Sequence, residues 1–287
     1  MTTMHESAKQ TSLDTTEYAT AWGLSQPGLR ELLITCYRSG DVVSDAQRFY
    51  ASAEFAETLA IFAQMGKPAD TKVKVLDVGC GNGLASYALA RAGYNVTGVD
   101  ISEGELAGLQ GARRLIGQDN VHFVVVNSDM DDTALPTDFD IIYMRQALHH
   151  SDDPVATVSG LSRILLPGGV FCAIREHVVR NEAQRQQFLA NHPFQPITQD
   201  EHAYTLAEYR AAFRTAGLVQ RVELYPFDAA INFYPGNHEE LVAYLSGRLH
   251  IDLRQHGWLR TRVLRLLAWK HQRKSDQLYS FFYQKLF

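Results

Sequence analysis

The sequence has few of the features that mark secreted, zinc-scaffolded or membrane-spanning proteins. It contains 3 cysteines in 287 residues, and no two of them form a Cys-x-x-Cys pair. This argues against a disulfide framework and against a zinc knuckle. No apolar run approaches the roughly 20 residues that cross a bilayer, and the polar first residues show no secretory signal. We therefore expect a cytoplasmic protein.

An excess of positive charge is also absent. The chain carries 27 Lys and Arg against 32 Asp and Glu, a net charge of -5, so its overall field does not attract nucleic acid or an anionic membrane. We expect no DNA partner and disfavour RNA. Residues 257–274 depart from this balance, because all their charged side chains are basic and two tryptophans lie among them. This segment predicts a peripheral membrane contact or, by default, a helix packed on the sheet or at a dimer contact. Monomer and homodimer both stay open.

The order of predicted elements indicates an α/β protein. We expect a flexible terminus over residues 1–16 and a helical lid over residues 17–68, with two helices between Gln26 and Met65 that separate at Ser39-Gly40. From Val73 onwards, short apolar strands alternate with helices, which predicts a largely parallel sheet covered on both faces. The predicted strands are 73–78, 94–100, 121–126, 139–144, 170–174, 222–227 and 278–283, and the helices are 84–92, 103–116, 154–165, 181–190, 206–216 and 237–274.

A glycine-rich loop follows the first predicted strand, with glycines at 79, 81 and 83. Glycine lets the backbone turn sharply and approach a ligand, although such a loop can also be a plain tight turn. A dinucleotide-binding loop has its third glycine at the position of Leu84 here. Asp77 would repel a pyrophosphate and attract a methionine ammonium group, and Asp100 ends the second strand, where a carboxylate can accept both ribose hydroxyls. Together these residues favour S-adenosylmethionine over NAD.

The run Val75–Gly83, followed by Gly98–Ser102, closely resembles motif I and its acidic follower in class I S-adenosylmethionine-dependent methyltransferases. The resemblance covers the core, residues 71–178. It implies a doubly wound, Rossmann-like sheet of seven strands in the order 3-2-1-4-5-7-6 within a methyltransferase domain over residues 69–287. Residues 179–204 and 235–275 would then be insertions on the acceptor side.

The resemblance also implies a cofactor site. Asp129 would take the adenine amino group, Met130 would supply a backbone amide and Ile101 would pack on the adenine face. Asp100 could instead cap the next helix, Asp129 could be a turn residue, and Cys80 fits a small structural residue better than a catalytic thiol. The full predicted cofactor set is Asp77, Gly79, Cys80, Gly81, Gly83, Asp100, Ile101, Ser128, Asp129, Met130, Arg145 and Gln146.

Histidines follow the fourth and fifth predicted strands, at the sheet edge where ligands bind in such folds. A hydroxyl acceptor needs its proton removed, and histidine titrates near neutrality, so these histidines favour O-methylation. The candidates are His177, then His149, with Glu176 beside them, and a structural role for each stays open. Glu176, His177 and Asp129 could also bind a metal, but we expect none.

We therefore predict an enzyme that methylates an oxygen of a small molecule or saccharide by in-line transfer from S-adenosyl-L-methionine, leaving S-adenosyl-L-homocysteine. Aromatic residues and histidines within residues 188–204 would either close over the acceptor or pack on the sheet. The alternatives are an RNA or protein methyltransferase, disfavoured because Arg145–Leu148 replaces an Asn-Pro-Pro-Tyr-type tetrad, and a catalytically inactive cofactor-binding partner protein. A dehydrogenase is a distant third.

Overall fold

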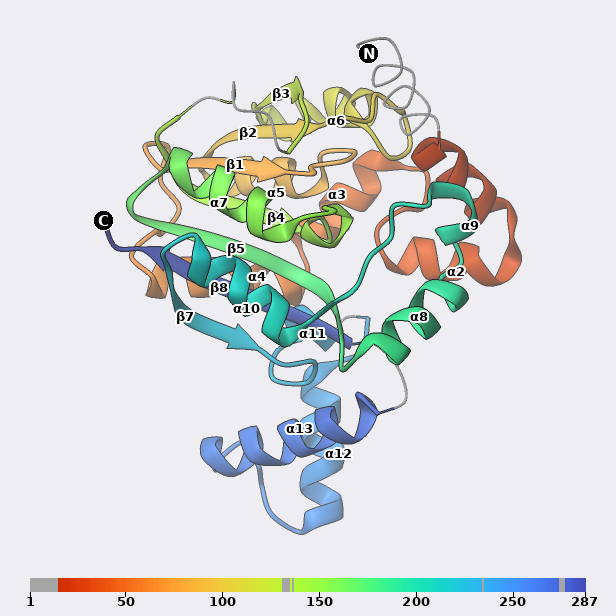
Figure 1. Ribbon diagram of the computed structural model, residues 1–287, viewed down its shortest axis with the longest axis vertical. Coiled ribbons are helices and arrows are strands. Elements are labelled where there is room, and N and C mark those ends of the chain that lie inside the picture. Colours follow the sequence, from red (N-terminus) through yellow and green to blue (C-terminus); the bar gives the residue numbers. More distant parts are fainter. Residues whose placement is uncertain (1–14, 131–134, 136, 234, 274–276) are drawn as a thin grey trace.

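A twisted sheet forms the centre of the computed structural model, which describes residues 15–130, 135, 137–233, 235–273 and 277–287 (Figure 1). The strand order is β3-β2-β1-β4-β5-β8-β7, and a short β6 pairs with β5 alone. This confirms the predicted fold class and order, because the sixth and seventh predicted strands are β7 and β8. The strands are β1 Lys74–Val78, β2 Asn95–Asp100, β3 Val124–Asn127, β4 Phe139–Arg145, β5 Leu165–Val179, β6 Tyr204–Thr205, β7 Leu218–Leu224 and β8 Gln277–Lys285.

Helices cover both faces of the sheet, as its nearly continuous apolar strands require. Alternate residues of a strand point to opposite faces. Accordingly, Val75 packs with the apolar cluster on one face, whereas Leu76 and Val78 pack with the cluster on the other. The first face carries α3 Val42–Tyr50, α4 Ala53–Gln64, α5 Leu84–Ala92, α6 Leu109–Leu115 and α11 Ala230–Phe233; the second carries α7 Pro154–Ile164 and α10 Leu206–Thr215.

Side-chain caps set several helix boundaries. The Asp153 carboxylate accepts the N–H groups of Val155 and Ala156 at the start of α7, as predicted. Ser52 caps α4 by accepting the N–H of Phe55, and this cap interrupts what we predicted as one helix. Residues 27–64 therefore hold three helices, α2 Pro27–Thr35, α3 and α4, where two were expected.

The predicted helix over residues 103–116 begins only at Leu109, and a distant side chain explains the difference. The carboxylate of Glu17 accepts the N–H groups of Glu105, Leu106 and Ala107 at 3.0–3.1 Å. Glu17 belongs to a helix over residues 15–25. The predicted flexible terminus is therefore wrong for residues 15 and 16, and residues 1–14 lie outside the described part of the chain.

The fifth strand is longer than predicted, because it continues from Leu165 through the expected turn to Val179. Its pairing with β8 shifts register between Ala173 and Glu176, and Arg175 there has a positive φ of 61°. These features mark a β-bulge. Arg175, Glu176 and His177 therefore lie within the strand and not after it, a correction to our prediction. The sixth predicted strand is likewise displaced, since β7 ends at Leu224.

The predicted lid over residues 17–68 divides into two parts. Phe49, Phe55 and Phe62 of α3 and α4 are fully buried in the main core, so these helices belong to the layer that covers the sheet. Residues 15–25 instead lie beside the carboxyl edge of the parallel strands. That edge also carries η2 Leu148–His150, α8 Glu182–Asn191 and α9 Gln195–Thr198. The short helix η1 Gln118–Asn120 precedes β3.

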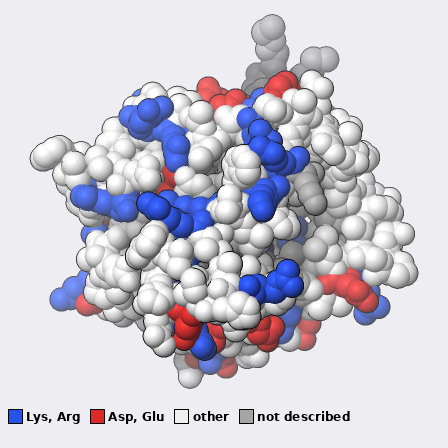
Figure 2. Space-filling view, turned by 90° about the horizontal axis from the view of Figure 1, so that it is seen from below, with Lys and Arg blue, Asp and Glu red and all other residues white. Residues whose placement is uncertain are grey.

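Two helices, α12 His238–Leu249 and α13 Gly257–His271, project from the lower end of the sheet where one helix was predicted (Figure 1). His250, with a positive φ of 54°, ends α12. Figure 2 shows Lys and Arg side chains gathered on this end of the molecule. Trp258 and Trp269 are exposed, with arginines over their rings. Membrane contact by this end stays a prediction.

Across the described residues, no helix combines the length and the apolar character that a membrane crossing requires.

A buried ion pair joins the N-terminal helices to the sheet. Arg145, the last residue of β4, donates to Glu54 of α4 at 2.6 and 3.2 Å. Arg175 of β5 lies 3.8 Å from the same carboxylate, and Glu54 is fully buried. Removing one partner of such a cluster leaves buried charges uncompensated.

We expect Glu54→Gln to lower the free energy of unfolding by about 3–5 kcal/mol, because Arg145 and Arg175 would stay buried beside a neutral amide. Urea unfolding followed by circular dichroism measures this change. Glu103→Gln is the matched control: its pair with Arg113 is exposed, so the loss should stay below about 1 kcal/mol. Equal losses in the two variants would contradict the role assigned to Glu54.

Candidate active site

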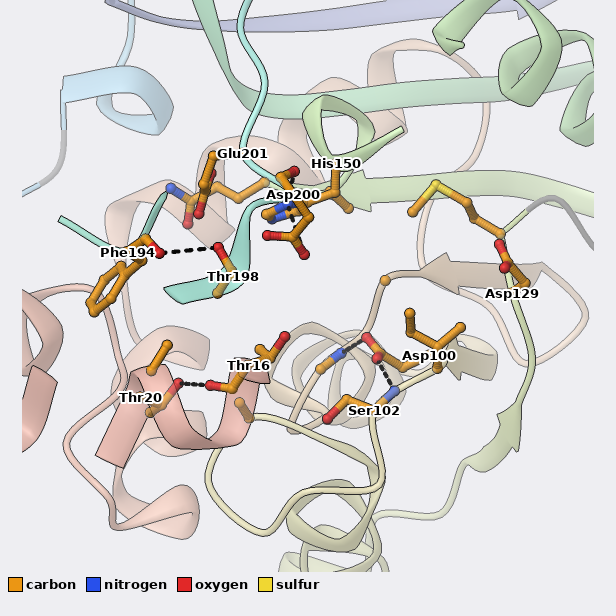
Figure 3. Close-up of a pocket in the computed structure, with 18 of the residues that line it drawn as sticks. Thr16, Thr20, Asp100, Ser102, Asp129, His150, Phe194, Thr198, Asp200 and Glu201 are labelled. Atoms are coloured by element: carbon orange, nitrogen blue, oxygen red, sulfur yellow. Dashed lines mark hydrogen bonds and ion pairs between the residues drawn. The ribbon is translucent and has the colours of Figure 1, made fainter. Parts of the chain in front are cut away.

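A cavity of about 1000 Å³, counted with its open mouth, lies at the carboxyl edge of the parallel strands. Its walls come from the glycine loop, the ends of β2 and β4, the segment after β3, the helix over residues 15–25 and the segment 194–201. Figure 3 shows Asp100 and Ser102 on one wall and His150, Asp200 and Glu201 gathered across the cavity from them. Ligands bind at this position in open α/β sheets.

Asp100 is fixed by the backbone around it. One carboxylate oxygen accepts the N–H of Gly81 at 2.7 Å, and the other accepts the N–H of Ser102 at 2.8 Å. Burial raises the pKa of Asp100, and these two hydrogen bonds oppose the rise. Each oxygen keeps a lone pair for a further donor. The carboxylate therefore suits a pair of neighbouring hydroxyl groups in the cavity.

The glycine loop is shaped for close approach. Gly79 and Gly81 line the cavity with φ values of +68° and +54°, a region that other residues rarely adopt. A Cβ on Gly79 would lie 2.7 Å from the Cβ of Ala147. Gly83, which we also assigned to the cofactor, lies outside the cavity lining and instead lets α5 pack against Ala112 of α6.

The residues predicted to hold adenine also border the cavity. Ile101, Ser128, Asp129 and Met130 all line it, and the N–H of Ser128 donates to the carbonyl of Asp100 at 3.1 Å. The side chain of Ile101 is 41% exposed, so it offers an apolar surface to a flat ring. The structure thus brings the ends of β2 and β3 together as predicted.

A smaller cavity of about 530 Å³ adjoins the first at the glycine loop. Asp77, Cys80, Arg145 and Gln146 line it, as does Arg38. Burial raises the pKa of the Cys80 thiol well above its usual value, which agrees with a structural role. Arg38, which follows α2, lines both cavities; we did not predict it, because nothing in the local sequence links that segment to the glycine loop.

The histidine pair after β4 divides between the core and the cavity. His149 is buried, and its Nδ1 lies 2.7 Å from the Glu176 carboxylate. That carboxylate also accepts the N–H groups of Ala147, Leu148 and His149 at 3.0–3.2 Å. Burial lowers the pKa of His149 well below its usual value and thus favours the neutral ring. His150, by contrast, lines the cavity.

Our catalytic candidates, His177, His149 and Glu176, lie together but outside the cavity lining. The rings of His177 and His149 are 5.0 Å apart between centroids. The polar groups that do face the cavity here are His150, Asp200 and Glu201. The sequence offered two signals: the pair His149-His150 after the fourth predicted strand, and the aromatic residues with interspersed histidines in the predicted acceptor-side insertion.

Asp77 is the buried acid beside the glycine loop. Its carboxyl accepts the hydroxyl of Ser86 at 2.6 Å, and burial raises its pKa from 3.8 to about 7. The folded protein therefore holds this proton more tightly than the unfolded chain does. The stability that results is complete below about pH 4 and is lost as the pH rises through about 7.

We expect the free energy of unfolding of Asp77→Asn to increase relative to that of the wild type as the pH rises from 4 to 8. The difference should change by up to about 4 kcal/mol. Urea unfolding of both proteins across this pH range measures the change. Taking the difference between their free energies of unfolding removes the contributions of other acids. Ser86→Ala should extend the loss to higher pH values, since the hydrogen bond from Ser86 lowers the pKa of Asp77 and that pKa would rise further without this donor. A difference curve without slope would refute this assignment.

Residues 76–173 match the family model described as "Methyltransferase domain". The ubiquinone biosynthesis O-methyltransferase of Pseudomonas fluorescens is 36% identical over 96 residues, which are 33% of this chain and 41% of that protein. The chain thus matches less than half the length of this curated relative.

Two solved structures share the fold at 18% and 17% identity. The geranyl diphosphate C-methyltransferase of Streptomyces coelicolor, solved with Mg²⁺, geranyl diphosphate and S-adenosyl-L-homocysteine, has a TM-score of 0.54 over 80% of this chain and 79% of its own. The [4+2]-cyclase SpnF has a TM-score of 0.52 over 79% and 80%. With the strand order, the glycine loop and the domain match in agreement, residues 76–173 form a methyltransferase domain of the class I, S-adenosylmethionine-dependent type.

Proposed function

We propose that this protein uses S-adenosylmethionine to methylate an oxygen atom of a small molecule. One observation carries the proposal: a single cavity joins Asp100 and the glycine loop at one end to His150 and Glu201 at the other. The first end suits a nucleoside, and the second suits a polar acceptor. The named O-methyltransferase relative supports the oxygen acceptor, although it matches only the core.

The residues present fit the cofactor. The positive-φ glycines leave space that a Cβ would fill, and each Asp100 oxygen can accept a ribose hydroxyl beside its backbone donor. Asp77 lies in the adjoining cavity, where it would attract the ammonium group, and Arg38 would attract the carboxylate. When bound, S-adenosylmethionine supplies an electrophilic methyl group on sulfur.

The chain's own contribution is to hold the acceptor in line and to exclude water. Thr16, Ala19 and Thr20 close the cavity from the N-terminal side, and Phe194 and Thr198 close it from the acceptor-side insertion. His150 lies where it would contact an acceptor. His177 and His149, our predicted bases, lie outside the cavity lining and would act through the ring contacts that link them to His150. Their catalytic role stays a prediction.

A small acceptor is favoured over RNA or protein. The basic end formed by α12 and α13 contributes no residue to the cavity lining, so it would not guide a nucleic acid into the site. A protein that binds the cofactor without catalysis would need no polar group opposite Asp100. The histidine and acidic side chains at the acceptor end favour an enzyme.

Calorimetry should show that S-adenosylmethionine or S-adenosylhomocysteine binds and that NAD does not. Asp100→Asn should weaken this binding at least tenfold, because a charge-assisted hydrogen bond contributes about 1.5–3 kcal/mol. Asp119→Asn changes an exposed residue that lines neither cavity and should leave this binding unaltered. A wild-type protein that binds neither sulfur compound would overturn the proposal.

His150→Ala should reduce labelled methyl transfer into an extract of small metabolites at least tenfold and should change the affinity for S-adenosylmethionine less than threefold, since His150 faces the acceptor end. His122→Ala removes an exposed histidine remote from the cavity and should have no effect. His177→Ala, measured alongside, tests our sequence-based choice. Transfer unaffected by the loss of His150 would exclude an acceptor at this wall.

A further inference from the structure

We propose that His149, His150 and Glu201 bind a divalent transition-metal ion at the acceptor end of the cavity, contrary to our expectation of no metal. One ligand atom from each of the three lies within 4.8 Å of the others. His149 and Glu201 are buried, and His150 is half-buried. Two imidazoles with a carboxylate form a donor set that suits zinc or iron(II) better than magnesium or calcium.

The separation between His149 and Glu201 is close to that between two ligands of one ion. Nε2 of His149 lies 3.7 Å from an oxygen of Glu201, and Nδ1 of His192 lies 3.6 Å from the other oxygen. Both distances are longer than a hydrogen bond. Ligands about 2.0–2.1 Å from a tetrahedral zinc ion lie about 3.3 Å from each other. A small inward movement would therefore place His149 and Glu201 around an ion.

In both histidines Nδ1 has the kind of partner that it has in metal ligands. A ligating imidazole usually donates its other ring N–H to a carboxylate or a backbone carbonyl. Nδ1 of His149 lies 2.7 Å from Glu176, and Nδ1 of His150 lies 3.2 Å from the carbonyl oxygen of Asp200. In the tautomers that these contacts require, Nε2 of each ring holds a lone pair. Glu176 is thus a positioning residue for His149.

Glu201 is held in place before any ion binds. Its N–H donates to the side chain of Gln195 at 3.0 Å. The residues next to Glu201 contact η2 and residues 151 and 152. Asp200 contacts His150, and His202 lies 3.1 Å from Asp152. The hydroxyl of Tyr204 donates to the carbonyl of Ser151. With the backbone fixed in this way, only the side-chain rotations of Glu201 are lost when its carboxylate coordinates an ion.

Three protein ligands leave coordination positions open, as in catalytic zinc sites. His150 and Glu201 line the cavity, so those positions would face the acceptor. This part of the inference rests on the proposed function: an acceptor with one or two oxygen atoms able to bind the ion would be held there, and coordination would lower the pKa of its hydroxyl. Metal binding itself does not depend on methyl transfer.

The test uses the full-length protein, stripped with EDTA and returned to chelator-free buffer without S-adenosylmethionine. Titration with ZnCl₂ by calorimetry should give one equivalent per chain, and Co²⁺ should produce visible absorption bands typical of a nitrogen- and oxygen-ligated ion. Glu201→Gln and His150→Ala should weaken zinc binding at least a hundredfold. Glu176→Gln should weaken it about 10–100-fold, the usual effect of losing a group that orients a ligand.

His122→Ala is the control, because it removes an exposed histidine that belongs neither to the cavity lining nor to the cluster; its zinc affinity should stay within twofold of the wild type. Thermal unfolding and S-adenosylmethionine binding show whether each variant is folded. Weak binding of several equivalents, or zinc affinity unchanged in Glu201→Gln, would overturn the metal site. Zinc binding without S-adenosylmethionine binding would refute the proposed function alone.

Discussion

The carboxylate of Glu176 is the interaction on which the acceptor end of the cavity depends. It is fully buried and accepts three consecutive backbone N–H groups, from Ala147 to His149, besides contacting the His149 ring. Burial raises its pKa to about 7, and the three backbone donors oppose that rise. A buried carboxylate is tolerated only with such partners. The segment after β4 is thereby held in one conformation, which presents His150 to the cavity.

This arrangement needs the bulge in β5. Side chains alternate between the faces of a regular strand, and a bulge changes where the next side chains point. Arg175 has a positive φ, and its N–H donates to the side-chain hydroxyl of Ser280 in the neighbouring strand β8. Its guanidinium donates to the carbonyl of Ile231 and lies near Glu54. The polar network beneath the site therefore extends to the pair between Glu54 and Arg145, which ties stability to the geometry of the site.

The sequence predicted which residues gather at the glycine-loop end of the cavity, because the determinants of that end are local. A glycine loop after β1, an acid at the end of β2 and an acidic turn after β3 are each read within a few residues, and the parallel sheet places them at one edge. The element boundaries that were predicted wrongly, the start of α6 and the end of β5, depend on distant partners. Nothing near Glu105 indicates that its N–H is taken by Glu17, and nothing near Ala173 indicates a bulge, so a regular helix and a regular strand end were the natural predictions.

The acceptor end was harder to predict for the same physical reason. Its wall joins His150, which follows β4, to Glu201, about fifty residues later, through contacts between two irregular segments. Periodicity carries no information about such segments, and the pair His149-His150 alone does not indicate which ring faces the core. The difference between the two ends of the cavity also explains how one fold can serve different reactions. The cofactor end follows from the shared sheet, whereas a methyltransferase and a [4+2]-cyclase both have this fold. A shared fold therefore leaves the reaction open, and the part of the cavity that differs from the shared sheet is the wall that residues 194–201 build opposite Asp100.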